Sequence, residues 1–185
     1  MKRRGSQGKP TTANEVFESV RTVLAVREYQ NRELPDDVVL RILEAAHLTA
    51  SASNRQPWHF VLVRERESLR ELAALDRTGR YTADAGAAVI VAYEKESPYG
   101  VSDASRAIQS MILTAWADGV GSNWTGFGGM EAIRVRYGLP DTYDVLAVIP
   151  LGYPKRKLGR GRKNRKPFDQ VVSSERFGKP IPTKI

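Results

Sequence analysis

A short polar segment, residues 51–56, combines side chains that could bind a flat heterocycle. It reads S-A-S-N-R-Q and runs into a Pro-Trp pair. A carboxamide offers both a carbonyl acceptor and an NH2 donor, so Asn54 and Gln56 could each read donors and acceptors along one edge of a ring. Loops commonly carry binding groups on a rigid scaffold. The alternative is an ordinary loop whose Asn and Gln bond to their own backbone.

The elements on either side must hold this loop in place. Apolar residues at helical spacing predict a helix over residues 38–49. Pro35 and the acids Asp36 and Asp37 come first, where Pro tolerates the first helical turn and acids suit the positive end. An apolar strand is predicted over residues 60–63. The binding loop is therefore expected between a helix and a strand.

The rest of the chain also alternates between helices and strands. Helices are predicted over residues 14–25, 67–75, 103–118 and 131–137, and strands over residues 87–93 and 145–151. The 103–118 helix is nonpolar over more than one face, so it should be buried broadly, in a core or across a subunit interface. The strands are apolar on both sides, which indicates a sheet covered by helices and an α+β fold.

Length and composition fit one domain of 185 residues, 41% of them hydrophobic. We expect a mobile basic leader over residues 1–13, a single domain over 14–178 and a tail over 179–185. The sequence contains neither the apolar run of a secretory signal nor a stretch long enough to span a membrane. A cytoplasmic protein with no membrane partner is therefore expected.

The residue types also exclude several kinds of chemistry. The chain has no Cys, which rules out disulfides, thiolate catalysis and Cys-ligated metal sites. We interpret the two histidines, His47 and His59, as packing or hydrogen-bonding residues rather than metal ligands. No Ser-His-Asp set and no clustered carboxylate pair stands out. A bound cofactor is therefore expected to carry any chemistry.

The formal charge of +8 is concentrated in residues 155–166. Such a cluster can attract nucleic acid, but this one lacks interleaved aromatics and a recognition helix. We therefore expect no nucleic-acid partner, although a solvated basic loop remains an alternative to a phosphate site. Lys163 and Arg165 lie two residues apart, so in an extended segment both could reach one phosphate.

Several strings resemble the nitroreductase family of flavin enzymes. Residues 50–58, A-S-A-S-N-R-Q-P-W, resemble the family signature P-S-x-x-N-x-Q-P-W, with Ala50 in place of the usual Pro. Similar strings occur, in the family's order, at residues 26–29, 43–46, 119–122 and 163–167. The resemblance extends from about residue 20 to about residue 178.

The resemblance implies a mostly antiparallel sheet flanked by helices, in a homodimer with a long helix buried in the interface. It also implies FMN as the cofactor and NAD(P)H as the co-substrate. Hydride would pass to a nitroaromatic, a quinone or a similar acceptor by a ping-pong mechanism. Neither the natural acceptor nor the choice between NADH and NADPH can be read from the sequence.

The resemblance also implies which residues bind FMN. The nine matched positions are Arg27, Ser51, Ala52, Asn54, Gln56, Thr125, Gly126, Lys163 and Arg165. The 51–56 loop of one subunit is expected against the flavin whose phosphate and ribityl chain contact the other subunit's cations. Thr125 and Gly126 match a turn beside the reactive flavin nitrogen, where a backbone N–H would stabilise developing charge. The simpler interpretation is a tight glycine turn that starts the next helix.

One departure concerns the phosphate. Many family members carry Arg-Arg-Ser or Arg-His-Ser where residues 23–25 of this chain read V-L-A. Up to two cationic contacts are therefore missing, and Arg21 could compensate for them. Two alternatives stay open: a specialised flavin relative, such as a reductive dehalogenase or a deazaflavin-linked reductase, and a flavin-poor binding protein that kept the fold.

Overall fold

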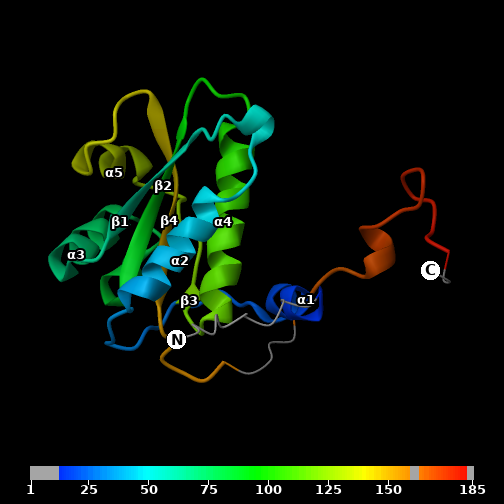
Figure 1. The fold of residues 1–185 in the computed structure, drawn as a ribbon, viewed down its shortest axis with the longest axis horizontal. Helices are drawn as coiled ribbons and strands as arrows, with labels where there is room; N and C mark the ends of the chain where they lie inside the picture. Colours follow the sequence, from blue (N-terminus) through cyan, green and yellow to red (C-terminus); the bar gives the residue numbers. More distant parts are fainter. Residues whose placement is uncertain (1–12, 159–162, 183–185) are drawn as a thin grey trace, which may run out of the picture.

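A computed structural model describes residues 13–158 and 163–182 of the chain (Figure 1). The predicted basic leader, apart from Ala13, lies outside the described residues. So do residues 183–185 of the predicted tail.

The centre of the fold is a four-stranded sheet in the order β1-β2-β4-β3, and every pair in it is antiparallel. Its strands are β1 (Trp58–Val63), β2 (Ala87–Glu94), β3 (Gly121–Ser122) and β4 (Tyr143–Gly152). This arrangement confirms the predicted α+β fold with a mostly antiparallel sheet. The β3 strand was not predicted, because two residues are too short to show an alternating pattern.

Helices cover both faces of the sheet (Figure 1). Helices α2 (Asp36–His47) and α4 (Gly100–Ala117) share one core cluster with alternate residues of β2. Helices α3 (Arg66–Leu75) and α5 (Met130–Arg136) share a second cluster with the intervening β2 residues. Since successive side chains of a strand point to opposite faces, a strand buried on both sides must be apolar throughout. That is why β2 was recognisable in the sequence.

The long helix α4 has two apolar faces with different environments. Small and medium side chains on one face, including Ala107 and Met111, are fully buried in the core. The second face carries Ile112, Leu113 and Trp116, which the chain itself covers only in part. Within one chain, α4 is therefore a core helix with a partly open apolar side.

Helix α1 (Ala13–Thr22) ends three residues earlier than predicted. The chain leaves it to pair with β3: Ala25 bridges Ser122, and the Val26 N–H donates to the Ser122 carbonyl at 2.8 Å. This tertiary pairing overrides the helical periodicity of the local sequence.

Helix α1 and the C-terminal segment, residues 163–182, project from the same side of the body (Figure 1). The exposed fractions of Val16, Phe17 and Val20 on α1 are 56%, 62% and 45%. Phe168 and Phe177 of the C-terminal segment are also exposed. Among the described residues, the hydrogen bonds of residues 164–182 stay within that segment. Both elements thus present apolar side chains that the other described residues leave exposed.

Candidate functional site

The 51–56 loop folds back on itself through its first residue. The Ser51 Oγ accepts the Gln56 N–H at 2.9 Å, and the Ser51 carbonyl accepts the Asn54 N–H at 3.1 Å. Between these two bonds lies the short 3-10 helix η1 (Ala52–Asn54). The loop is therefore a defined turn, and the side chains of Asn54 and Gln56 are exposed on it.

Three residues of this loop have a left-handed backbone. The φ angles are 52° at Ser53, 55° at Asn54 and 53° at Gln56. For residues other than Gly, this conformation costs roughly 1–2 kcal/mol each, with Asn the more tolerant type. Such strain tends to collect at ligand clamps and active sites. A cluster of three within six residues is consistent with a loop shaped for binding.

The carboxamides are partly engaged and partly available. The Gln56 Nε2 donates to the carbonyl of Asn54 at 3.2 Å and to its Oδ1 at 3.3 Å. Within the described residues, the Asn54 NH2 group and the Gln56 Oε1 have no hydrogen-bond partner. Each side chain therefore satisfies one function inside the loop and offers the complementary one to a ligand.

A buried carboxylate outside the predicted set fixes the loop to α4. The Ala52 N–H donates to Asp103 Oδ2 at 3.0 Å. Asp103 lies in the first turn of α4 and is fully buried, with its Oδ1 3.4 Å from Arg106 Nη1. A charge removed from water needs such partners. Asp103 had no distinguishing spacing in the sequence, where it looked like an ordinary acid near a helix start.

Arg27 lies in a different part of the molecule, between α1 and α2. Its side chain is exposed and lines a pocket of about 270 Å3 formed by residues 25–28 with Pro154, Arg156 and Leu158. Glu28 and Arg156, also in this pocket, form an ion pair with a 3.3 Å separation. Arg27 is thus accessible from one side of a modest cavity.

Lys163 packs against the end of α1. Its Nζ donates to the Val20 carbonyl at 2.5 Å. Burial, and then the nearby positive charges of Arg165 and Arg21, lower the pKa of the Lys163 ammonium. Among the described residues, the Arg165 guanidinium donates only to the neighbouring carbonyl of Asn164, through Nη1 at 3.1 Å. The structure therefore gathers Lys163, Arg165 and Arg21, of which Arg21 is paired with Glu18, and the remaining positive charge favours an anion.

Thr125 and Gly126 differ in what they can offer. The Thr125 N–H donates to the Val148 carbonyl at 3.0 Å, and the Val148 N–H returns a bond of 2.8 Å. The Thr125 hydroxyl points inward to Asp76 Oδ1 at 3.1 Å. By contrast, no residue in the described ranges accepts the N–H of Gly126. Of the two predicted positions, only Gly126 has an available backbone donor.

Seven of the nine predicted residues, all except Thr125 and Gly126, form two groups at opposite ends of α4. The 51–56 loop is bonded to Asp103 near the start of that helix. Near its other end, Trp116 Nε1 donates to Thr22 Oγ1 at 3.0 Å, which fixes the end of α1. Thirteen residues of helix rise about 20 Å. In Figure 1, the segment that follows α2 lies at one end of α4 and α1 lies at the other, so one chain does not bring the loop and the cations together.

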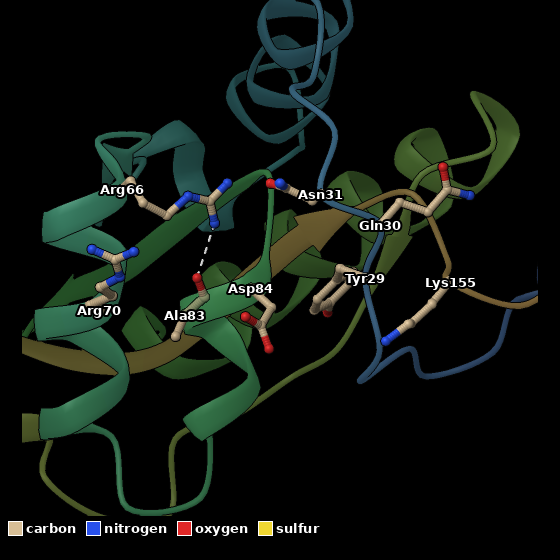
Figure 2. A pocket seen from close by; sticks show the side chains of 8 residues that line it. All are labelled: Tyr29, Gln30, Asn31, Arg66, Arg70, Ala83, Asp84 and Lys155. Atoms are coloured by element: carbon tan, nitrogen blue, oxygen red, sulfur yellow. Dashed lines mark hydrogen bonds between the residues drawn. The ribbon is translucent and has the colours of Figure 1, made fainter.

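A separate polar pocket of about 640 Å3 lies beside α3 (Figure 2). Its lining residues are Tyr29, Gln30, Asn31, Arg66, Arg70, Ala83, Asp84 and Lys155. Two of its cations are already engaged. Arg66 Nη1 donates to the carbonyls of Ala83 and Ala85, each at 3.0 Å, and Arg70 pairs with Glu67 at 3.3 Å. None of the nine predicted residues lines this pocket, and we do not assign the cofactor to it.

The described residues contain neither a metal-binding cluster nor a membrane-spanning helix. No group of three His, Cys, Asp or Glu side chains converges on a metal position within residues 13–158 and 163–182. His59 instead packs edge-on against the Tyr143 ring, 6.2 Å between centroids, whereas His47 is exposed rather than packed. In that same part of the chain, no helix combines the length and apolarity that crossing a bilayer requires.

Comparisons with known proteins show the family to which the sequence is similar. A profile of the nitroreductase family matches residues 21–88 and 76–153. A Methanothermobacter thermautotrophicus protein, provisionally named NADH dehydrogenase/NAD(P)H nitroreductase, is 37% identical over 153 residues, covering 78% of this chain and 80% of that protein. A protein of the same provisional name from Archaeoglobus fulgidus is 36% identical over 150 residues, or 76% and 86% of the two chains.

The fold gives the same result. A crystal structure from Bacteroides thetaiotaomicron, under the same provisional name, superposes with a TM-score of 0.82 at 28% identity. The match covers 90% of this chain and 100% of that chain. With its profile match, its close relatives and its fold in agreement, the chain belongs to the nitroreductase family.

Proposed function

We propose that this chain is an FMN-dependent oxidoreductase that passes hydride from NAD(P)H to a nitroaromatic, quinone or similar acceptor by a ping-pong mechanism. Membership of the nitroreductase family supports the general part of this statement, an NAD(P)H-dependent flavin oxidoreductase. FMN supplies the chemistry, since it can take up hydride from one substrate and give it to another. The protein binds, orients and tunes it.

The observation that carries the proposal is the separation of the predicted residues along α4. A two-fold axis across the middle of α4 would place the 51–56 loop of one copy beside Arg27 and Lys163 of the other. Such an interface is isologous, so one contact generates two equivalent sites. The partly covered side of α4 and the exposed Phe17 of α1 supply apolar surface for it. We therefore propose a homodimer whose two cofactor sites are shared between subunits.

The residues of these two groups fit FMN. Its phosphate is a dianion, and the Lys163 environment, with Arg165 and Arg21 nearby, favours an anion. The available functions of Asn54 and Gln56 include one donor and one acceptor, as the mixed edge of a flavin ring requires. Arg21, whose guanidinium also pairs with the Glu18 carboxylate, would supply part of the cationic role that the missing Arg pair at residues 23–24 leaves open.

The chain's own contribution to the reaction is then electrostatic. The available N–H of Gly126 would stabilise negative charge that develops on the cofactor, because it is fixed before the reaction begins. The carboxamides of Asn54 and Gln56 would orient the ring. None of the predicted ring contacts is a group that titrates near neutral pH, so water would serve the proton transfers.

The decisive experiment is the identity of the bound cofactor. Purified protein should show flavin absorption, and heat should release FMN that chromatography identifies. FAD as the sole flavin would contradict the proposal. A colourless protein that cannot be reconstituted would favour the flavin-poor binding protein. Steady-state kinetics with NADH and NADPH, against a quinone and a nitroaromatic, should give the parallel lines of a ping-pong mechanism.

A further inference from the structure

A fully buried carboxylate at the end of α3 has no role in the site described so far. Asp76 Oδ1 lies within hydrogen-bond distance of three donors: the Thr78 N–H at 3.0 Å, the Thr78 hydroxyl at 3.2 Å and the Thr125 hydroxyl at 3.1 Å. The two hydroxyls are themselves 2.8 Å apart. A single carboxylate oxygen thus joins the turn after α3 to the segment that precedes Gly126.

Each hydroxyl hydrogen of this cluster has an acceptor. Each threonine hydroxyl has one hydrogen to donate and lone pairs to accept. One hydroxyl donates to Asp76, and the other donates either to Asp76 or to its hydroxyl neighbour. Asp76 is the one member that only accepts when ionised. The hydrogen bonds of the cluster therefore depend on Asp76 Oδ1 as their acceptor.

The same two segments also interlock through their backbones. A Cβ on Gly79 would lie 2.2 Å from Asp76 Oδ2 and 2.8 Å from Thr125 Cγ2. A Cβ on Gly129, whose φ is 87°, would lie 2.0 Å from the Leu75 carbonyl oxygen. Glycine is required at both positions for the turns to approach this closely. The geometry therefore depends on contact between residues 75–79 and 125–129.

The burial of Asp76 is only partly compensated by hydrogen bonds. Its second oxygen, Oδ2, is buried and has no hydrogen-bond partner within the described residues. A buried polar atom without a partner destabilises a fold. An Asn at this position would keep an acceptor at Oδ1.

We propose that Asp76 is a positioning residue: it acts through the Thr125 hydroxyl to hold the Gly126 N–H toward the cofactor. This inference rests on the proposed function, in which that N–H faces the flavin. The backbone N–H and carbonyl of Thr125 are both bonded to Val148. With its hydroxyl bonded to Asp76 as well, Thr125 is fixed at three points, and these set the direction of the next peptide N–H.

The test compares Thr125→Val with Thr125→Ser in the flavin-loaded protein. Valine has nearly the shape of threonine but no hydroxyl, whereas serine keeps it. Amide hydrogen exchange at residues 77 and 125 reports directly on the contact between residues 75–79 and 125–129, since these N–H groups bond to the carbonyls of Gly128 and Val148. The central β2 amide of Val89 provides the internal reference for global stability. We expect exchange to be about tenfold to a hundredfold faster in Thr125→Val, and near wild type in Thr125→Ser.

The flavin midpoint potential is the second readout, and a purely structural role would not move it. A tenfold weaker preference for the reduced flavin corresponds to about 30 mV for two electrons. We expect Thr125→Val to shift the potential by about that amount in the negative direction, and Thr125→Ser to restore it. Asp76→Asn, which keeps one acceptor oxygen, should give a smaller shift of the same sign.

Each outcome decides the inference. Faster local exchange with a lowered potential in Thr125→Val, both reversed in Thr125→Ser, supports it. Unchanged exchange at residues 77 and 125 in both Thr125→Val and Asp76→Asn overturns it, as does a loosened turn with an unchanged potential. Failure of the proposed function would look different: the wild-type protein would not retain FMN. The exchange data would still show whether Asp76 fixes the turn.

Discussion

The backbone N–H of Ala52 donates to Asp103 Oδ2 at 3.0 Å, and this bond joins the candidate binding loop to the first turn of α4. Because the other end of α4 is bonded through Trp116 to the end of α1, the helix sets the spacing between the two halves of the site. Its length separates them within one chain. The same length would bring them together in a pair of antiparallel α4 helices.

The first prediction concerns Asp103. Asp103→Ala should leave the Ala52 N–H unpaired and remove the partner of Arg106. We expect a loss of about 1–3 kcal/mol in the free energy of unfolding, the usual cost of an unpaired buried group, together with weaker FMN binding. Urea unfolding and fluorescence titration measure the two effects. The control is Asp37→Ala, an exposed carboxylate 3.7 Å from Arg41, which should stay within about 0.5 kcal/mol. Equal losses in both variants would contradict a special role for Asp103.

The second prediction is that the protein is a tight homodimer, with α1 and α4 in an interface of the obligate, largely apolar type. Phe17→Glu places a charge on the exposed apolar face of α1 and should weaken both the dimer and FMN retention. Val135→Glu is the matched control, because Val135 is 64% exposed on α5, which covers the opposite side of the sheet. Sedimentation equilibrium compares the dimer affinities of the Phe17→Glu and Val135→Glu variants. A folded, flavin-loaded wild-type monomer at micromolar concentration would rule this arrangement out.

The sequence predicted the sheet and its helices where periodicity reports burial directly. Strand β2 is apolar on both faces because helices cover both, and α4 is long enough to show its pattern. The end of α1 was placed too late, since Val23 and Leu24 continue the apolar pattern while the pairing of Val26 with Ser122 ends the helix. Such a tertiary contact is not visible in local periodicity.

The site was predictable only in part. The 51–56 loop has a recognisable string of residues, whereas Asp76 and Asp103 are single carboxylates whose importance comes from burial. Burial of a lone acid depends on segments distant in the chain, and no spacing in the sequence reports it. The choice between Thr125 and Gly126 likewise required the Val148 pairing, which assigns the Thr125 N–H to the sheet.

The third prediction concerns Arg165, whose guanidinium donates, within residues 13–158 and 163–182, only to the adjacent Asn164 carbonyl. Arg165→Ala should therefore change the free energy of unfolding little. It should weaken FMN binding by about tenfold to a hundredfold, the effect of losing one charge-assisted contact. Lys166→Ala removes a neighbouring exposed cation and is the control, with a smaller effect expected. Equal FMN affinity in wild type, Arg165→Ala and Lys166→Ala would indicate that Arg165 belongs to a solvated basic surface and not to a phosphate site.

The fourth prediction concerns the pH dependence set by Lys163, whose pKa is lowered below the ordinary value of 10.5 by burial and by Arg165 and Arg21. Without FMN, the folded state releases this proton before the unfolded state does. The contribution of Lys163 to stability therefore rises with pH between the lowered pKa and 10.5. FMN affinity should fall over the same window, because the phosphate needs the charged ammonium. Lys163→Arg should remove both trends while keeping the affinity. A pH-independent FMN affinity in the wild type would exclude Lys163 as a phosphate contact.

The last prediction separates strain from binding at Gln56. Its φ of 53° is unfavourable for glutamine, at a cost of roughly 1–2 kcal/mol that glycine avoids. Glycine in turn costs roughly 0.5–1 kcal/mol of backbone entropy, so Gln56→Gly should leave the free energy of unfolding unchanged or slightly higher. It should nevertheless weaken FMN retention and shift the midpoint potential, because the carboxamide that offers its Oε1 is gone.

The matched variant is Gln56→Asn, which keeps a carboxamide and suits the left-handed backbone. It should retain more FMN than Gln56→Gly at similar stability. No new pH dependence is expected in either variant, since no titrating group is removed. The measurements are urea unfolding, flavin fluorescence titration and potentiometry on the same preparations. If Gln56→Gly binds FMN with wild-type affinity and potential, the carboxamide does not read the flavin. The three left-handed residues of the loop would then serve only its turn.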